Sequence, residues 1–149
     1  DPWECGRRRQ AKKAQQGERV GMDFGHGAVA GLTGYVIGPQ PEPIGPGLPA
    51  MFRPLQELEN QALNSWYINV LACYPKHRGR GYGSYLLNLA EDMCRADGLQ
   101  RQCLIVASNN SGAKRLYERA GFIRIAKAIC VKEKWDTDMK HWELMIKSI

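Results

Sequence analysis

The sequence predicts a single α/β domain in which helices cover a mixed central sheet. Apolar, strand-like segments alternate with amphipathic, helical segments between residues 65 and 131. The chain has 149 residues, which suits one domain with a core of its own. Hydrophobic residues make up 44% of it and charged residues 24%, and it contains no internal repeat. We therefore treat residues 1–149 as one domain.

The first half of the chain is predicted to hold a helix, a strand and a long loop. Residues 2–16 have the pattern of an amphipathic helix, which a glycine-containing break follows. Residues 28–38 are β-branched and punctuated by glycine, as in a strand. Six prolines from Pro39 to Pro54 exclude a helix or a central strand there. We expect an ordered loop or flap, with one or two helical turns after it in residues 55–62.

The second half begins with a predicted central strand and a helix. Residues 65–75 alternate large and β-branched side chains and stop at a proline. Apolar residues then recur at helical spacing from Gly83 to Asp97, and Gly98 supplies the C-terminal stop.

Three strands and one more helix complete the predicted domain. Residues 101–108 are almost continuously apolar, which is typical of a buried strand. Residues 109–122 predict a helix that Asn110 or Ser111 caps. Two closing strands follow at residues 122–131 and 141–147. This alternation of strands and helices requires a mixed sheet.

Cysteine usage and apolar run lengths predict the compartment. The five cysteines form no CxxC pair and their number is odd, which favours reduced thiols over a disulfide frame or a zinc site (Cys5, Cys73, Cys94, Cys103 and Cys130). No apolar run approaches the roughly 20 residues that a membrane span needs, and no signal-peptide pattern is found. We expect a cytoplasmic protein without a metal.

Basic residues concentrate in two segments. The net charge is +6, and much of the excess lies in residues 7–13 and 76–80. A basic surface suits nucleic acid or an anionic small molecule. Residues 7–13 also fit a solvated helix face, and no aromatic side chains interleave their charges, so a nucleic-acid partner is disfavoured.

The loop at residues 78–83, RGRGYG, predicts an anion site. Free N–H groups and the macrodipole at a helix start favour an anion. Glycines let a phosphate approach the backbone, while Arg78 and Arg80 add forked donors. A P-loop is excluded because no lysine follows Gly83, and a dinucleotide fingerprint because Ser84 replaces its third glycine. A pyrophosphate-bearing cofactor fits this loop, and a plain tight turn is the alternative.

Two motifs together resemble the GNAT superfamily of N-acetyltransferases. Arg78-x-x-Gly81-x-Gly83, between a strand and a helix, resembles its acetyl-CoA pyrophosphate motif. Residues 109–122 resemble its second motif, in which the matching positions are Asn110, Ala113, Leu116, Tyr117, Gly121 and Phe122. The resemblance spans residues 28–147. It implies a mostly antiparallel sheet, splayed at the cofactor and flanked by helices. The superfamily's first strand and helix have no counterpart here, so we expect an N-terminally incomplete domain.

The resemblance also implies a place for each part of acetyl-CoA. Main-chain groups of Leu71, Ala72 and Cys73 would pair with the pantetheine arm like an added strand. Asn110 would hydrogen-bond the pantetheine or cap its helix, and Tyr117 would lie near the thioester sulfur. The N–H groups that would hold the pyrophosphate belong to Arg78, Gly79, Arg80, Gly81, Tyr82 and Gly83.

The implied reaction is direct acetyl transfer to a primary amine of a small molecule or peptide. Tyr117 would protonate the leaving thiolate, with aromatic packing as its structural alternative. A backbone N–H near Leu71 would stabilise the oxyanion. The amine needs a base, and among Glu57 and Glu59 we favour Glu59, whose alternative is a solvated carboxylate. The histidines are less attractive.

The sequence is also compatible with a function other than catalysis. A non-catalytic CoA-binding regulatory module would keep the cofactor loop and lack a base. Trp66, Tyr67 and Trp135 either line an acceptor site or pack in the core. A homodimer is also compatible with the sequence.

Overall fold

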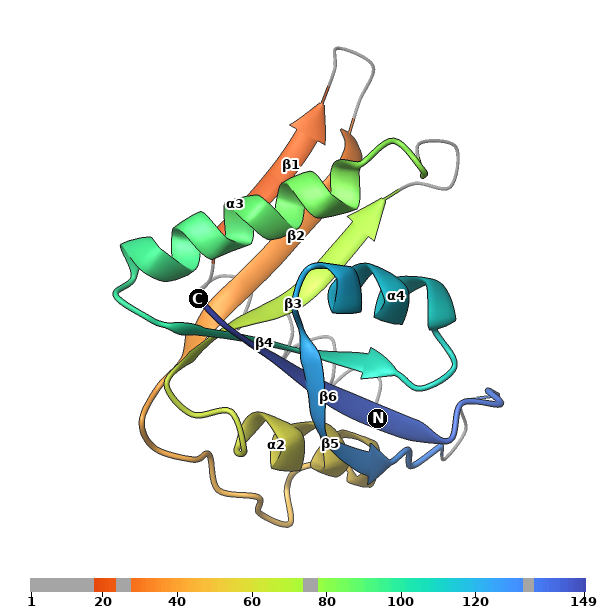
Figure 1. Cartoon of the computed structure of the whole chain (residues 1–149). Coiled ribbons are helices and arrows are strands. Elements are labelled where there is room, and N and C mark those ends of the chain that lie inside the picture. The colour runs from red at the N-terminus through yellow and green to blue at the C-terminus, as the bar shows by residue number, and fades with distance from the viewer. Residues whose placement is uncertain (1–17, 24–27, 74–77, 133–135) are drawn as a thin grey trace.

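The computed structural model describes residues 18–23, 28–73, 78–132 and 136–149, and its α/β architecture is the predicted one. One sheet has the strand order β1-β2-β3-β4-β6-β5 (Figure 1). The strands are β1 Glu18–Asp23, β2 Ala28–Ile37, β3 Ser65–Cys73, β4 Arg101–Ala107, β5 Ile123–Ile129 and β6 His141–Ser148. The helices are the 3-10 turn η1 Ala50–Phe52, α2 Arg53–Glu59, α3 Tyr82–Ala96 and α4 Ser111–Arg119.

The sheet is mostly antiparallel and opens in its middle. Strands β3 and β4 are parallel and share three residue pairs, of which Ile68–Leu104 is the last. At the next residue, Asn69, the register between β3 and β2 shifts by a bulge. Beyond it β3 continues to pair with β2, while β4 continues with β6. The predicted splay between two central strands is therefore confirmed.

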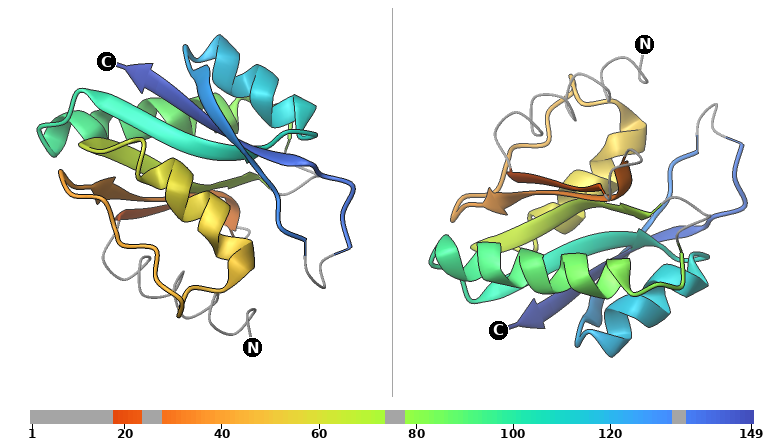
Figure 2. Two further views of the ribbon diagram at one scale, coloured as in Figure 1. Left: turned by 90° about the horizontal axis from the view of Figure 1, so that it is seen from below. Right: turned by 90° about the horizontal axis from the view of Figure 1, so that it is seen from above.

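Helices cover the two faces of the sheet unequally. Both views in Figure 2 place α3 and α4 on one face and α2 on the other. The core under α3 and α4 includes Leu32, Trp66, Ile68, Leu86, Ala90, Leu104, Val106, Tyr117, Phe122 and Met145. The core on the α2 face includes Leu58, Ala62, Tyr67, Cys103, Leu144 and Ile146.

Trp66 and Tyr67 pack in the core, which was one of the two roles that the sequence allowed for them. Trp66 is fully buried, and its indole N–H donates to Asp97 at 3.0 Å. A Cβ at Gly34 would lie 2.2 Å from the Trp66 ring, so only glycine fits beneath it. Trp135 lies outside the described residues.

Cap residues fix the ends of α3 and α4. Gly81, with φ of +81°, precedes α3, and Gly98, with φ of +74°, follows it. The Asn110 side chain accepts a hydrogen bond from the Ala113 N–H at 3.3 Å, so Asn110 and not Ser111 caps α4. Of the helices that the structure describes, none has the length and apolar character of a membrane span.

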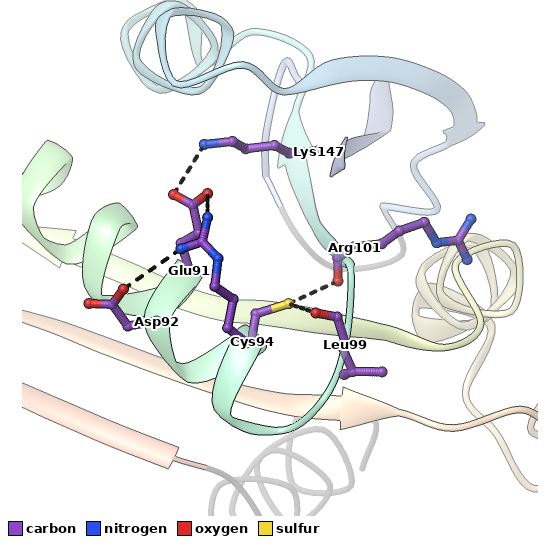
Figure 3. A network of polar contacts seen from close by, with 7 residues as sticks. Glu91, Asp92, Cys94, Leu99, Arg101 and Lys147 are labelled. Carbon is purple, nitrogen blue, oxygen red and sulfur yellow. Dashed lines mark hydrogen bonds and ion pairs between the residues drawn. The ribbon is translucent and has the colours of Figure 1, made fainter. Parts of the chain in front are cut away.

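Polar contacts hold the C-terminal half of α3 against the sheet (Figure 3). Glu91 accepts from Arg95 at 2.9 Å and pairs with Lys147 of β6 at 3.6 Å. The Cys94 thiol lies 3.4–3.5 Å from the carbonyl oxygens of Leu99 and Arg101. These contacts anchor the helix whose opposite end faces the candidate site.

The proline-rich segment is an ordered loop only as far as Pro49. Residues 50–59 are helical, and Pro54 occupies the first turn of α2, where a missing N–H costs no helical hydrogen bond. The Asn60 side chain fastens the loop to α2, because it accepts from the Glu42 N–H at 3.0 Å and donates to the Glu42 carbonyl at 2.9 Å.

Strand β1 was not expected from the sequence. Its six residues, ERVGMD, are interrupted by Gly21 and lack a regular apolar alternation, so their strand conformation depends on pairing with β2. The predicted helix at residues 2–16 lies outside the described residues, as do His26, His77 and the basic segment 7–13.

Candidate active site

A cavity of about 850 Å³ lies beside the N-terminus of α3. Its wall joins β3, the loop at residues 78–83, the first turns of α3 and one face of α4. The residues that line the cavity include Leu71, Arg78, Gly79, Gly81, Tyr82, Gly83, Asn110, Ala113, Leu116 and Tyr117. The structure thus brings the two motifs, about thirty residues apart in sequence, to one cavity.

The glycines of the loop serve two different purposes. Gly79 and Gly81 have φ of +78° and +81°, and a Cβ on either would meet open space. Their requirement for glycine therefore comes from the backbone conformation. Gly83 differs, because a Cβ there would lie 2.9 Å from Leu116 Cδ2. Gly83 thus lets α4 pack closely against the first turn of α3.

The start of α3 offers hydrogen-bond donors to this cavity. The first hydrogen bond of the helix runs from the Tyr85 N–H to the Gly81 carbonyl at 3.0 Å. The N–H groups before Tyr85 have no acceptor within the helix, which is the arrangement that binds anions. Arg78 is part of the wall, whereas Arg80 is not among the residues that line it, and both arginines are exposed.

One edge of β3 is open where it passes the cavity. Leu71, Ala72 and Cys73 pair through their main chain with Leu32, Gly31 and Ala30 of β2. They lie beyond the last pair between β3 and β4. Their second edge therefore faces the gap between these strands, as an added extended ligand would require. Of the three, Leu71 also lines the cavity.

Tyr117 belongs both to the core and to the cavity wall. The residue is 9% exposed, and its ring packs edge-on against Phe122, with ring centroids 6.0 Å apart. Burial raises the pKa of the Tyr117 phenol above its ordinary value of about 10. The phenol is therefore protonated at neutral pH and has a proton to give. Asn110 likewise has two places, since it caps α4 and lines the cavity.

Glu59 lies in a different cavity from Tyr117. This second cavity, of about 250 Å³, is lined by residues at the end of β2, by the start of the proline-rich loop and by α2. Glu59 is 4% exposed and accepts a hydrogen bond from the Tyr35 hydroxyl. The solvated-surface alternative is therefore wrong for Glu59, whereas Glu57 is exposed.

Strand pairing locates Glu59 relative to the gap. Burial raises the pKa of the Cys103 thiol to about 12, the Ser65 hydrogen bond opposes this rise, and the negative charge of Glu59 adds to it. Tyr35, the hydrogen-bond partner of Glu59, pairs with Tyr67 of β3, and the two ring centroids lie 5.0 Å apart. Cys103 pairs with Tyr67, next to the last pair before β3 and β4 separate. Glu59 therefore sits near the closed end of the gap, on the α2 face.

Among the cavity residues that sequence reasoning missed, three bear on the chemistry: Arg115, Arg119 and Tyr35. Arg115 and Arg119 line the larger cavity from α4. Their spacing of four on a predicted helix was a usable signal, because such residues share one face. Tyr35, the partner of Glu59, lies 24 positions away in sequence, and no local pattern indicates that contact.

The geometry agrees with the comparison to known families. The chain matches the model of the acetyltransferase (GNAT) family over residues 4–122. It belongs to this family. The predicted family is confirmed, and the predicted enzyme class, an acetyltransferase, is the class of this family.

A curated relative is similar over a shorter stretch. The mycothiol acetyltransferase of Beutenbergia cavernae is 42% identical to this GNAT chain over 59 residues, which are 40% of this chain and 20% of that protein. The match thus spans about a fifth of the relative's length.

Solved structures share the fold over nearly the whole chain. The IAA acetyltransferase from Bacillus cereus superposes with a TM-score of 0.69 at 15% identity, covering 95% of this chain and 84% of that one. A Bacillus subtilis acetyltransferase in complex with CoA gives a TM-score of 0.69 at 12% identity, covering 97% and 85%. At these identities the likeness shows the fold, and it confirms the predicted sheet.

Proposed function

We propose that this GNAT protein transfers the acetyl group of acetyl-CoA directly to a primary amine of a small molecule or peptide. The observation that carries the proposal is the larger cavity, which combines a helix N-terminus, an open strand edge and a buried phenol. These three features match the pyrophosphate, the amide-bearing pantetheine and the thioester of acetyl-CoA.

The loop and β3 would hold the cofactor. N–H groups of residues 78–83 and the Arg78 guanidinium would bind the pyrophosphate, helped by the dipole of α3. Main-chain groups of Leu71, Ala72 and Cys73 would bind the pantetheine amides along the open edge. An N–H in this stretch would also stabilise the oxyanion of the transferring group.

Glu59 is our proposed general base. Acetyl-CoA supplies a thioester whose carbonyl carbon the amine attacks and whose C–S bond breaks. The amine must first lose a proton, because a protonated amine has no free electron pair. Glu59 would accept that proton from the α2 face, at the closed end of the gap, while Tyr35 orients its carboxylate.

Tyr117 is our proposed general acid. Its phenol, which belongs to the core on the α3 and α4 face, would donate a proton to the departing thiolate from the side of the sheet opposite α2. Packing against Phe122 would fix the ring during this transfer. Two proton transfers on two faces would then leave an amide and a free thiol.

Release of free thiol from acetyl-CoA tests the proposal. The purified protein would be assayed against polyamines, aminoglycosides, aromatic amines and peptides with free N-termini. At least one class should give thiol in step with an acetylated product seen by mass spectrometry. Calorimetric binding of acetyl-CoA without turnover on any amine would favour the non-catalytic module. The absence of acetyl-CoA binding would contradict both.

A further inference from the structure

Two arginines on α4 line the larger cavity and have no part in the proposed transfer. Arg115 and Arg119 are four positions apart, so they lie on one side of α4, and both line the cavity. They come from a different helix than the N–H groups and Arg78, which we assign to the pyrophosphate. The cavity therefore carries a second set of cationic groups.

These arginines differ from the other basic residues around them. Lys114 pairs with the buried Glu143 at 2.7 Å, and Lys147 pairs with Glu91 at 3.6 Å (Figure 3). No carboxylate within the described residues pairs with Arg115 or Arg119. Arg119 lies in the last turn of α4, where its positive charge interacts favourably with the helix dipole. Arg115 lies in the middle of the helix, where this electrostatic stabilisation is small.

The chemistry of CoA supplies a second anion for this pair. Besides its pyrophosphate, CoA carries a phosphomonoester on the 3′ position of its ribose. A phosphomonoester has a charge of roughly −1.5 to −2 at neutral pH, and forked guanidinium donors match its oxygens. The N–H groups at the start of α3 already supply donors for the pyrophosphate. Arg115 and Arg119 are therefore available for the 3′-phosphomonoester.

We infer that Arg115 and Arg119 form a subsite for the 3′-phosphate of CoA, and that the protein thereby discriminates CoA from dephospho-CoA. The inference rests on the proposed use of acetyl-CoA. It assigns the face of α4 a role in cofactor selection, separate from the chemistry at Tyr117.

The test compares CoA with dephospho-CoA by calorimetry at low salt, using the wild type and the double variant Arg115→Gln/Arg119→Gln. The wild type should bind CoA about ten- to a hundredfold more tightly. The double variant should lose that factor for CoA and keep its affinity for dephospho-CoA within about twofold. Arg95→Gln/Lys127→Gln, which removes the same charge away from the cavity, should behave as the wild type.

Each other outcome has a definite meaning. Equal wild-type affinity for the two ligands overturns the subsite and leaves the proposed function intact. An equal loss for both ligands in the double variant assigns the arginines to the pyrophosphate and also overturns it. A loss for CoA in the charge-matched control shows long-range attraction instead of a subsite. Failure of the wild type to bind either ligand contradicts the proposed function itself.

Discussion

The two cavities lie on different faces of the same sheet, and their walls offer opposite chemistry. The larger one presents helix N–H groups, Arg78, Arg115 and Arg119, so its wall is rich in donors and positive charge. The smaller one presents Glu59 and Glu42 together with amide side chains, so its wall is rich in acceptors and negative charge. A phosphate-bearing donor suits the first wall, and a cationic amine suits the second.

The cavities also differ in how their polar groups are held. Glu59 is buried and accepts a hydrogen bond from the Tyr35 hydroxyl, whereas Arg115 and Arg119 are exposed. A buried acid must be oriented by the fold, because desolvation penalises it otherwise. An exposed arginine has almost no desolvation penalty in the absence of a ligand, because its guanidinium stays hydrated. The smaller cavity thus holds its carboxylate in one orientation, whereas the arginine side chains of the larger cavity are exposed to solvent.

Breaking the loop of the larger cavity should have the largest effect. Gly81→Val is expected to abolish acetyl-CoA binding, since valine is strained at φ of +81° and its branches would meet the pyrophosphate. Calorimetry measures the loss. Gly98→Val is the matched control, because Gly98 has φ of +74° and open space at the other end of α3. Both should lose stability of about 1–2 kcal/mol, and only the first should lose the cofactor.

Tyr117→Phe should separate chemistry from binding within the larger cavity. The ring and its contact with Phe122 remain, so acetyl-CoA affinity should hold. The proton is lost, so kcat should fall by about 10²–10⁴-fold. Because burial raises the pKa of this phenol, the wild-type rate should not decline through Tyr117 ionisation at neutral or mildly alkaline pH. Turnover within twofold of the wild type would assign Tyr117 to packing alone.

Glu59→Gln tests whether the smaller cavity takes part in the reaction. If Glu59 is the base, kcat should fall by about a hundredfold or more, while acetyl-CoA affinity stays unchanged. Glu57→Gln is the control, since Glu57 is exposed on the same helix and should be neutral. Equal rates for the two variants would remove the smaller cavity from the mechanism and leave only the cofactor side of our comparison.

Arg78→Ala should give the smallest of these effects. The N–H groups of the loop remain, and a charged hydrogen bond contributes about 1.5–3 kcal/mol, so acetyl-CoA affinity should fall roughly ten- to a hundredfold. The loss should shrink as salt rises, because the side chain is exposed. Unchanged affinity at low ionic strength would show that Arg78 contributes no binding energy.

Much of this protein is determined by local sequence. Alternation in residues 65–75 and helical spacing from Gly83 to Asp97 predicted β3 and α3 to within two residues at each end. These segments carry their own periodicity, because each buries one face. The same holds for the loop at residues 78–83, whose positive φ angles only glycine adopts cheaply. The sequence alone therefore predicted both motifs and the family.

Tertiary structure alone decided which residues share a cavity. The burial of Glu59 depends on Tyr35, and the Asn69 bulge that opens the sheet depends on the register between β2 and β3. The placement of Arg115 and Arg119 depends on how α4 packs against Gly83. Each of these is a contact between segments far apart in the chain, whose formation depends on the packing of the whole core. The periodicity of one segment does not indicate which distant segment it will contact.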